Sequence, residues 1–383
     1  MIRNVALKRF LVDKIFPVFS LVNKFTRKKE NQIFLYCAAN GDLSDNSEAL
    51  FDYMVANNYN RKYRIVCGVN DPGEYKDRIS QNISFVPKRQ CIKEYLRSKY
   101  VFYSFGKLPI KPTKDQCVIN LCHGITCKAP ALLSNINNGK EFFFSYICAS
   151  SEMYRPIMAK AFGCPEENVC ICGDPKADRL FEEKKDLGYK LIVWTPTFRQ
   201  SKYLGYNDSS AAQLLPLFEQ DEWEDLNRVL EENGVKLVVK LHPRQDVGEF
   251  THCENFSNLA IYSGAYFLEK KQNLYSLLAQ SDALISDYSS VYLEYLLLNR
   301  PICFMLGDMQ DYSDTRGFAF ENPLDFMPGE HVRDKQDLYK FIRDVANGRD
   351  PHKQKRENVR DLVHQYKDNK NCKRILDIAG IEV

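Results

Sequence analysis

The sequence contains no apolar run that approaches the roughly 20 residues a helix needs to cross a bilayer. The apolar pieces near its beginning are interrupted by charged residues at positions 8, 9, 13 and 14, unlike the apolar segment of a secretory signal. It also has no internal repeat and no low-complexity tract. These absences exclude membrane-spanning helices, repeat arrays and a disordered chain, and leave a globular protein.

Recognisable cofactor motifs are lacking as well. No G-x-G-x-x-G follows the first expected strand, so we expect no dinucleotide cofactor. Cys170 and Cys172 are too close together for standard zinc spacing and have no matching second pair. No group of Asp and Glu has the spacing of a magnesium site. The prediction is therefore that no cofactor is required, and nothing in the sequence indicates a divalent cation.

Cysteine, in contrast, is abundant, with 13 residues that form no framework of regular spacings. Several of them lie inside apolar runs, such as Cys67 in RIVCGV and Cys303 in PICFML. We expect reduced and mostly buried thiols, which is typical of a cytosolic protein.

The length of 383 residues predicts two domains of ordinary size, and 44% hydrophobic with 27% charged residues is a globular composition. The net charge of +3 is unevenly distributed. Residues 1–30 hold eight Lys and Arg against two Asp and Glu, which leaves 45 basic and 48 acidic residues in the remainder. The body is therefore not a polyanion binder, and we expect no nucleic-acid partner.

The basic segment 1–30 interleaves apolar and basic residues with helical spacing. Phe16, Phe19 and Val22 extend one apolar face, and Pro17 should kink or divide the helix. Two interpretations stay open. The segment is either an interfacial helix on an anionic membrane, or an amphipathic helix packed on the body with a solvated basic face.

Beyond residue 30, short β-branched or aromatic runs alternate with stretches of helical length, which indicates parallel sheets in an α/β protein. The expected strands are 33–37, 64–69, 83–86, 100–104, 117–122, 146–150, 169–172, 191–195, 236–242, 259–263, 283–287 and 301–305. They are too many for one doubly wound sheet, and the charged stretch 181–190 lacks apolar periodicity. We predict two Rossmann-like domains, 31–182 and 190–383, with a cleft between them.

Polar residues gather where these strands end, which is where open α/β sheets bind ligands. His123 and His242 are the two histidines at strand ends, one in each predicted domain. Strand alternation puts Lys240 on the same face as His242. We therefore expect both histidines to face the cleft, although each taken alone is also compatible with a structural role.

The stretch SDYSSVYLEYLLLNRP is typical of a strand, a turn and a helix. Ser289 and Ser290 would lie at the helix start, where free N–H groups suit a phosphate, and Glu294 would lie one turn later to accept from ribose hydroxyls. The alternative is a plain cap by Asp287 or Ser289. Arg316 and Gly317 form a second loop suited to phosphate after the next strand.

Seven blocks of the sequence, in order, resemble the CDP-glycerol:poly(glycerophosphate) glycerophosphotransferase family of teichoic acid assembly. SDYSSVYLEYLLLNRPICF and DYSDTRGFAF are the most specific of them. Ser47, Ile125, Thr126 and Glu294 depart from the family pattern. The blocks are SDNSEAL (44–50), HGITCK (123–128), AFGCPEENVCICGDPKAD (161–178), TPTFR (195–199), KLHPR (240–244), SDALISDYSSVYLEYLLLNRPICF (281–304) and DYSDTRGFAF (311–320).

This resemblance implies a GT-B fold with the acceptor side N-terminal and the donor nucleotide side C-terminal. It implies transfer of a polyol phosphate from a CDP-polyol to a lipid-linked or polymeric glycan, with release of CMP, at the inner face of the cell membrane. His123 is then the general base, and His242 stabilises the transferring phosphate or protonates the leaving group. The donor residues are Ser289, Ser290, Arg316, Gly317, Thr197, Arg199, Lys240, Asp287 and Glu294, and the acceptor residues are Lys128, Asp45, Asn46 and Gly124.

Two other functions remain open from the residues alone. A GT-B glycosyltransferase that uses a nucleotide sugar would place its diphosphate at the same helix start, and a non-catalytic binder of anionic polymer would use the same cleft. The nature of the released nucleotide separates the first from polyol-phosphate transfer, and turnover separates the second.

Overall fold

The computed structural model describes residues 15–37, 42–105, 108–125, 131–133, 142–197, 214–243, 245, 247–248, 250–307, 309, 313 and 318–383. The chain divides into two compact units. Unit 1 comprises Met1–Gly124, Asn138–Asp178 and Asp368–Val383, and unit 2 comprises Ile125–Asn137 and Arg179–Lys367.

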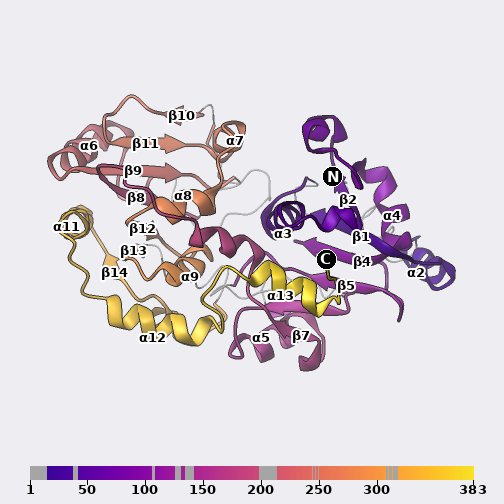
Figure 1. Cartoon of the computed structure of the whole chain (residues 1–383). Coiled ribbons are helices and arrows are strands. Elements are labelled where there is room, and N and C mark those ends of the chain that lie inside the picture. The colour runs from indigo at the N-terminus through magenta and orange to yellow at the C-terminus, as the bar shows by residue number, and fades with distance from the viewer. Residues whose placement is uncertain are drawn as a thin grey trace. The chain divides into compact units, whose positions relative to one another are not determined.

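Unit 1 is built on a seven-stranded sheet with the order β3-β2-β1-β4-β5-β6-β7. Figure 1 labels β1, β2, β4, β5 and β7 of this sheet. Every neighbouring pair in it is parallel, as expected for runs buried on both faces. The order from β3 to β6 is that of a doubly wound nucleotide-binding sheet. Its strands are β1 (Lys29–Cys37), β2 (Arg64–Val69), β3 (Ile83–Pro87), β4 (Ser98–Ser104), β5 (Cys117–Asn120), β6 (Tyr146–Ala149) and β7 (Val169–Ile171).

Unit 2 repeats this plan with the order β10-β11-β9-β8-β12-β13-β14. All its pairs are parallel except β10 with β11, so β10 is an antiparallel strand added at one edge. Its strands are β8 (Lys190–Trp194), β9 (Val235–Lys240), β10 (His252–Cys253), β11 (Leu259–Tyr262), β12 (Ala283–Ser286), β13 (Ile302–Met305) and β14 (Glu330–Val332).

Helices connect the strands of each sheet. Unit 1 contains α2 (Phe16–Phe25), α3 (Asp45–Ala56), α4 (Lys88–Arg97), α5 (Tyr154–Phe162) and α13 (Asn371–Ile378). Unit 2 contains α6 (Trp223–Glu232), α7 (Gly264–Glu269), α8 (Leu274–Gln280), α9 (Val291–Tyr295), α11 (Lys335–Ala346) and α12 (Lys353–Val363). None of the described helices is long and apolar enough to span a membrane.

Both faces of the first sheet are buried, which explains the continuous apolar runs. Alternate side chains of β1 point to opposite faces: Ile33 and Leu35 belong to one core cluster and Phe34 belongs to another. The α/β fold with two mostly parallel sheets is confirmed, and each of the 12 predicted runs forms a strand. The two short strands β10 and β14 were not predicted.

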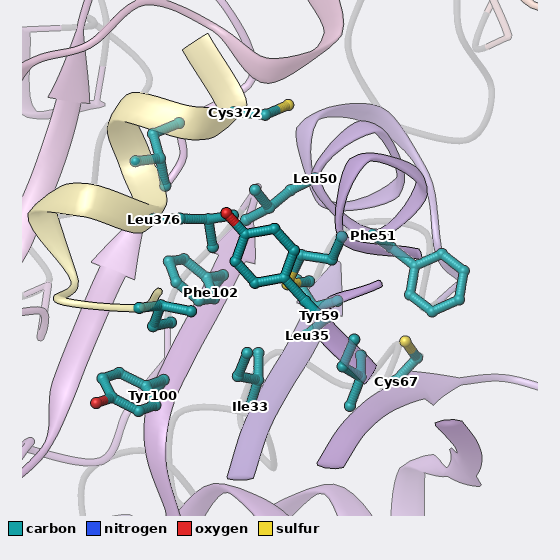
Figure 2. Packing of buried hydrophobic residues seen from close by; sticks show 14 of the residues in the cluster. Ile33, Leu35, Leu50, Phe51, Tyr59, Cys67, Tyr100, Phe102, Cys372 and Leu376 are labelled. Carbon is teal, nitrogen blue, oxygen red and sulfur yellow. The ribbon is translucent and has the colours of Figure 1, made fainter. Parts of the chain in front are cut away.

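The end of the chain differs from the predicted domain boundary. The prediction placed residues 190–383 in one domain, but unit 2 ends at Lys367 and α13 belongs to unit 1. Figure 2 shows Cys372 and Leu376 of α13 beside Leu50 and Phe102, in the core under α3. The apolar residues of α13 complete this core, which is why the chain returns to unit 1.

Part of the basic segment 1–30 lies in the described structure. Helix α2 begins one residue before Pro17, so proline occupies the first turn, where its missing N–H is tolerated. Phe16 and Phe19 pack against a core cluster of unit 1. The other apolar residues of this helix face outward, with Leu21 56% and Phe25 84% exposed.

Candidate active site

The carboxyl edge of the first sheet brings together residues from three separate parts of the chain. Asp45 and Asn46 open α3, His123 follows β5, and Lys176 lies in the loop after β7. The Lys176 Nζ donates to the His123 carbonyl oxygen at 2.6 Å and forms an ion pair with Asp45 Oδ1 at 2.8 Å. One buried cation therefore connects the predicted catalytic loop to the start of α3.

Asn46 forms the centre of this arrangement and is fully buried. Its Nδ2 donates to the Leu121 carbonyl at 2.9 Å and to Asp174 Oδ1 at 3.3 Å. Its Oδ1 accepts from the Lys176 backbone N–H at 3.1 Å. Each polar atom of the Asn46 side chain is thus used to connect β5 to the loop after β7.

Backbone strain is concentrated at the same edge. Asp45 (φ 58°), Phe105 (φ 64°) and Cys122 (φ 53°) all have left-handed backbone conformations. Such a conformation costs a residue other than glycine roughly 1–2 kcal/mol. Gly124, at φ 116°, has a conformation that only glycine adopts easily. Strain of this kind persists where the surroundings enforce it and is frequent at functional sites.

His123 lies above this buried network with its side chain exposed. Its ring contacts the Phe105 ring edge-on, with centroids 4.3 Å apart. The backbone of His123 is thus held from below by Lys176, and its imidazole is held from one side by Phe105. His123 lies just after the end of β5, as the strand pattern predicted, and its side chain is exposed.

The loop GDPKAD supplies three residues for which the sequence predicted no role. Asp174 accepts from Asn46, Lys176 holds the His123 loop, and the Asp178 carboxylate accepts from the Asn371 and Cys372 N–H groups at the start of α13, both at 2.9 Å. Burial raises the pKa of Asp178. The sequence signal that could have indicated these three residues is that polar residues occupy every second position directly after a strand.

The carboxyl edge of the second sheet is organised around Asp287, which is almost fully buried. Its Oδ2 accepts from the Thr197 N–H at 2.8 Å and the Thr197 hydroxyl at 2.9 Å, and its Oδ1 accepts from the Ser289 N–H at 3.2 Å. Asp287 therefore joins the loops after β8 and β12 rather than pointing outward. Ser289 and Ser290 remain partly exposed beside it.

His242 lies two residues after the end of β9 and is also partly exposed. It lines a small cavity together with Pro196, Thr197 and Gln245. A Cβ on Gly264 would approach the Pro243 Cα to 2.5 Å, so this glycine lets the start of α7 contact the turn after His242. The expected strand-end position of His242 is confirmed.

Three structural facts bear on the residues predicted to bind the donor. Glu294 was expected to reach ribose hydroxyls, but it is fully buried and accepts a hydrogen bond from the Tyr275 hydroxyl. The helix that follows the two serines, α9, has only 5 residues before it tightens into a 3-10 turn at Leu296–Leu298. Four further predicted residues lie outside the described part of the chain: Lys128, Arg199, Arg316 and Gly317.

Lys240 lies on the last position of β9 and is partly buried. Its ammonium group lies 5.9 Å from the centre of the Phe267 ring. Burial lowers the pKa of Lys240 to about 8. Among the described residues no cluster of His, Cys, Asp and Glu could hold a metal ion.

Comparison with known proteins decides the family. The sequence profile of the CDP-Glycerol:Poly(glycerophosphate) glycerophosphotransferase family matches residues 18–379, which includes both sheets. The chain belongs to this family. Its match extends from α2 to the end of α13, so the return of the chain to unit 1 lies within the region that the family shares.

Several curated proteins are similar to this chain over most of its length. The teichoic acid ribitol-phosphate polymerase TarL of Staphylococcus aureus is 26% identical over 389 residues, covering 94% of this chain and 64% of TarL. The chain therefore spans less than two thirds of that polymerase. The teichoic acid glycerol-phosphate transferase of the same organism is 23% identical and covers 91% of this chain and 92% of its own length.

A third relative and two solved structures complete the comparison. The teichoic acid glycerol-phosphate primase of Bacillus subtilis is 32% identical over 214 residues, or 53% of this chain and 50% of the primase. The wall teichoic acid polymerase TagF matches with a TM-score of 0.73 and 20% identity, and one of its variants with 0.75 and 18%. Each covers 99% of this chain and 95% of that structure, which shows a shared fold.

Proposed function

We propose that this protein transfers a polyol phosphate, in the first place glycerol phosphate, from a CDP-polyol to a hydroxyl of a lipid-linked or polymeric glycan, with release of CMP. The process would be teichoic acid or capsule assembly. The observation that carries the proposal is the family match over residues 18–379, which includes both strand-end histidines. The curated relatives, whose names specify glycerol- and ribitol-phosphate primases, transferases and polymerases, support it.

The reaction assigns a chemical step to each edge. His123 takes the proton of the acceptor hydroxyl, and the resulting oxygen attacks the phosphorus that carries the polyol. A new O–P bond forms, the bridging P–O bond of the diphosphate breaks, and CMP leaves with the electron pair. General base assistance of this kind is worth about 10²–10⁴-fold in rate.

His242 stabilises the transferring phosphate or protonates the departing CMP. Ser289 and Ser290 donate to the diphosphate with Arg316, Gly317 and Arg199, while Asp287 and Thr197 hold the loops that carry them. Lys128 contributes charge on the acceptor side, with Asp45, Asn46 and Gly124 shaping the backbone there. Positioning and charge neutralisation suffice for such a transfer, so we assign no cofactor.

We further assign the two units to the halves of a GT-B enzyme, with unit 1 on the acceptor side and unit 2 on the donor side. The support is that each unit carries its own sheet with a nucleotide-binding strand order. Because the observed unit 1 includes Asp368–Val383, the acceptor half includes α13, which the predicted domain boundary placed in the donor half.

An anionic membrane surface is the partner we propose for α2. Val18, Leu21 and Phe25 expose apolar side chains on this helix, and Lys24 and Arg27 lie beside them in the sequence. An apolar face with neighbouring basic residues suits the interface of a bilayer that contains anionic lipids. The enzyme would then work at the inner face of the cell membrane, where lipid-linked acceptors are found.

The test is incubation with CDP-glycerol and CDP-ribitol in turn, together with a lipid-linked glycan acceptor, and mass analysis of both products. Release of CMP with an acceptor heavier by one polyol phosphate supports the proposal and identifies the polyol. Turnover of a nucleotide sugar with release of a nucleoside diphosphate would instead show a glycosyltransferase. Binding of either donor without any turnover would show a binding module.

A further inference from the structure

Three neighbouring strands in the middle of the second sheet end in polar residues that share one face. The register pairs Trp194 with Val239 and with Ile285, and all three side chains lie in the same core cluster. Successive residues of a strand point to opposite faces, so the next residue of each strand turns away from this core. These next residues are Lys240, Thr195 and Ser286.

The two hydroxyl groups of this row are buried without hydrogen-bond partners. Thr195 is 5% exposed and Ser286 is fully buried. Neither Thr195 Oγ1 nor Ser286 Oγ has a hydrogen-bond partner among the described residues. A buried hydroxyl without a partner destabilises a fold, and most native structures avoid it. Two such groups therefore lie side by side in this row, with hydrogen-bonding capacity that no described residue uses.

Lys240 adds a positive charge at one end of the row, on the strand next to that of Thr195. It is partly exposed and makes no hydrogen bond or ion pair with any residue that the structure describes. The Phe267 ring lies beside its ammonium group, and burial lowers its pKa to about 8. A cation that has lost much of its water and has no carboxylate partner attracts an anion strongly.

We propose that Lys240, Thr195 and Ser286 form a subsite for phosphoryl oxygens of the donor. This inference rests on the proposed function, because it takes unit 2 as the donor side. Two hydroxyl groups, each able to donate a hydrogen bond, and one ammonium group form a row without a carboxylate, and such a row suits the accepting oxygens of a phosphoryl group. Asp287, the nearest carboxylate in the sequence, is already engaged with Thr197 and Ser289.

Thr195→Val tests the subsite because it replaces the hydroxyl with a methyl group of similar size. If the subsite exists, the Kd for CDP-glycerol rises by about tenfold, the loss expected for one hydrogen bond to an anion. The melting temperature should stay the same or rise by about 2–4 °C, because an unpartnered buried hydroxyl has been removed. Loss of binding without loss of stability distinguishes a ligand contact from a structural one.

Matched variants complete the experiment. Ser84 in β3 of unit 1 also carries a buried hydroxyl without a partner among the described residues, so Ser84→Ala is the control and should leave the Kd unchanged. Ser286→Ala and Lys240→Met should each weaken CDP-glycerol binding by tenfold or more. They decide the matter if Thr195→Val fails to fold.

Inorganic pyrophosphate, measured by competition and by direct titration, separates this proposal from the proposed function. If the wild-type protein binds pyrophosphate through the row but does not bind CDP-glycerol, the subsite stands and the proposed donor is wrong. If CDP-glycerol and pyrophosphate bind with wild-type affinity to all three variants, the row is structural and the subsite is overturned, while the proposed function is untouched.

Discussion

Two groups of residues, one at the carboxyl edge of each sheet, differ in how their hydrogen bonds are used. At the edge of unit 1, the cation Lys176 is paired with Asp45 and with the His123 carbonyl, and Asn46 has partners for both its polar atoms. At the edge of unit 2, Lys240 has no ion pair with any described residue, and two neighbouring buried hydroxyls have no partner there either. The contacts around Asn46 and Lys176 are satisfied internally, whereas Lys240, Thr195 and Ser286 include donors that no described residue uses.

This difference matches the two tasks of a phosphoryl transfer enzyme. A general base must be held in one orientation, so the residues around His123 use their hydrogen bonds to fix the backbone, and the strained conformations there are enforced by the surrounding contacts. A donor site must offer hydrogen bonds to an anionic ligand, so its groups remain available until the ligand binds. We infer that unit 1 positions the general base and that unit 2 binds the donor.

The largest effect that sharpens this comparison is expected for His242→Ala. Turnover should fall by about 10²–10⁴-fold, because the charge on the transferring phosphate or leaving CMP is no longer stabilised. CDP-polyol affinity should fall as well, since the residue belongs to the binding edge. His331→Gln, in β14 of the same unit, is the control for loss of a histidine and should keep both values.

Lys176→Met tests the positioning edge. We expect kcat to fall by roughly 10–100-fold with little change in donor KM, because the His123 loop loses its support while the donor side is intact. Lys176→Arg should restore most of the rate, since it keeps the charge. Lys184→Met removes an ion pair of similar length, 2.7 Å to Asp282, at the surface of unit 2 and should have no such effect. A larger change in donor KM than in kcat would contradict a positioning role.

Acid should destabilise unit 2 through a histidine that takes no part in the chemistry. His364 is buried and donates from Nε2 to the Leu293 carbonyl at 2.7 Å, and burial lowers its pKa from 6.5 to about 4. Between pH 6.5 and pH 4 the histidine is protonated in the unfolded chain but not in the folded chain. The free energy of unfolding therefore decreases as the pH drops through this range, by about 3 kcal/mol in total.

Denaturant titrations across this pH range provide the measurement. His364→Gln should reduce the dependence of stability on pH, whatever its effect on stability itself. His352 is a partly exposed histidine, and His352→Gln should leave this pH dependence as it is in the wild type. An unchanged slope in His364→Gln would show that other groups cause the acid sensitivity.

The smallest effect is expected for the exposed apolar side chains of α2, for which we propose membrane contact. Replacing Leu21 and Phe25 together by serine should reduce sedimentation with anionic vesicles by roughly tenfold without changing the fold, because both side chains are exposed. Leu268→Ser removes a leucine that is 65% exposed on unit 2 and is the control. If the double variant sediments with vesicles as well as the wild-type protein does, α2 is excluded as the membrane contact.

The fold was predictable where apolar runs coincide with buried strands. All 12 runs form strands because parallel sheets are covered on both faces, but β10 and β14 were missed because Glu330–Val332 and His252–Cys253 are short and polar. The return of α13 to unit 1 could not be read from the sequence, since an amphipathic helix does not specify which core it completes.

The candidate site was predictable only in part. His123 and His242 are at the ends of their strands, as the pattern indicated, because strand ends are set locally. The burial of Glu294 and its hydrogen bond from Tyr275 could not be predicted, because helical spacing does not tell whether a carboxylate faces a ligand or the core. Lys176 was missed because its partners, Asp45 and the His123 carbonyl, are far from it in the sequence.

The most direct test of the account is CMP release by His123→Ala, with CDP-glycerol affinity measured on the same preparation. If unit 1 positions the base and unit 2 binds the donor, CMP release falls by at least about 100-fold while the Kd for CDP-glycerol stays within a factor of two of the wild-type value. Near-normal CMP release, or loss of donor binding in step with loss of turnover, would contradict it.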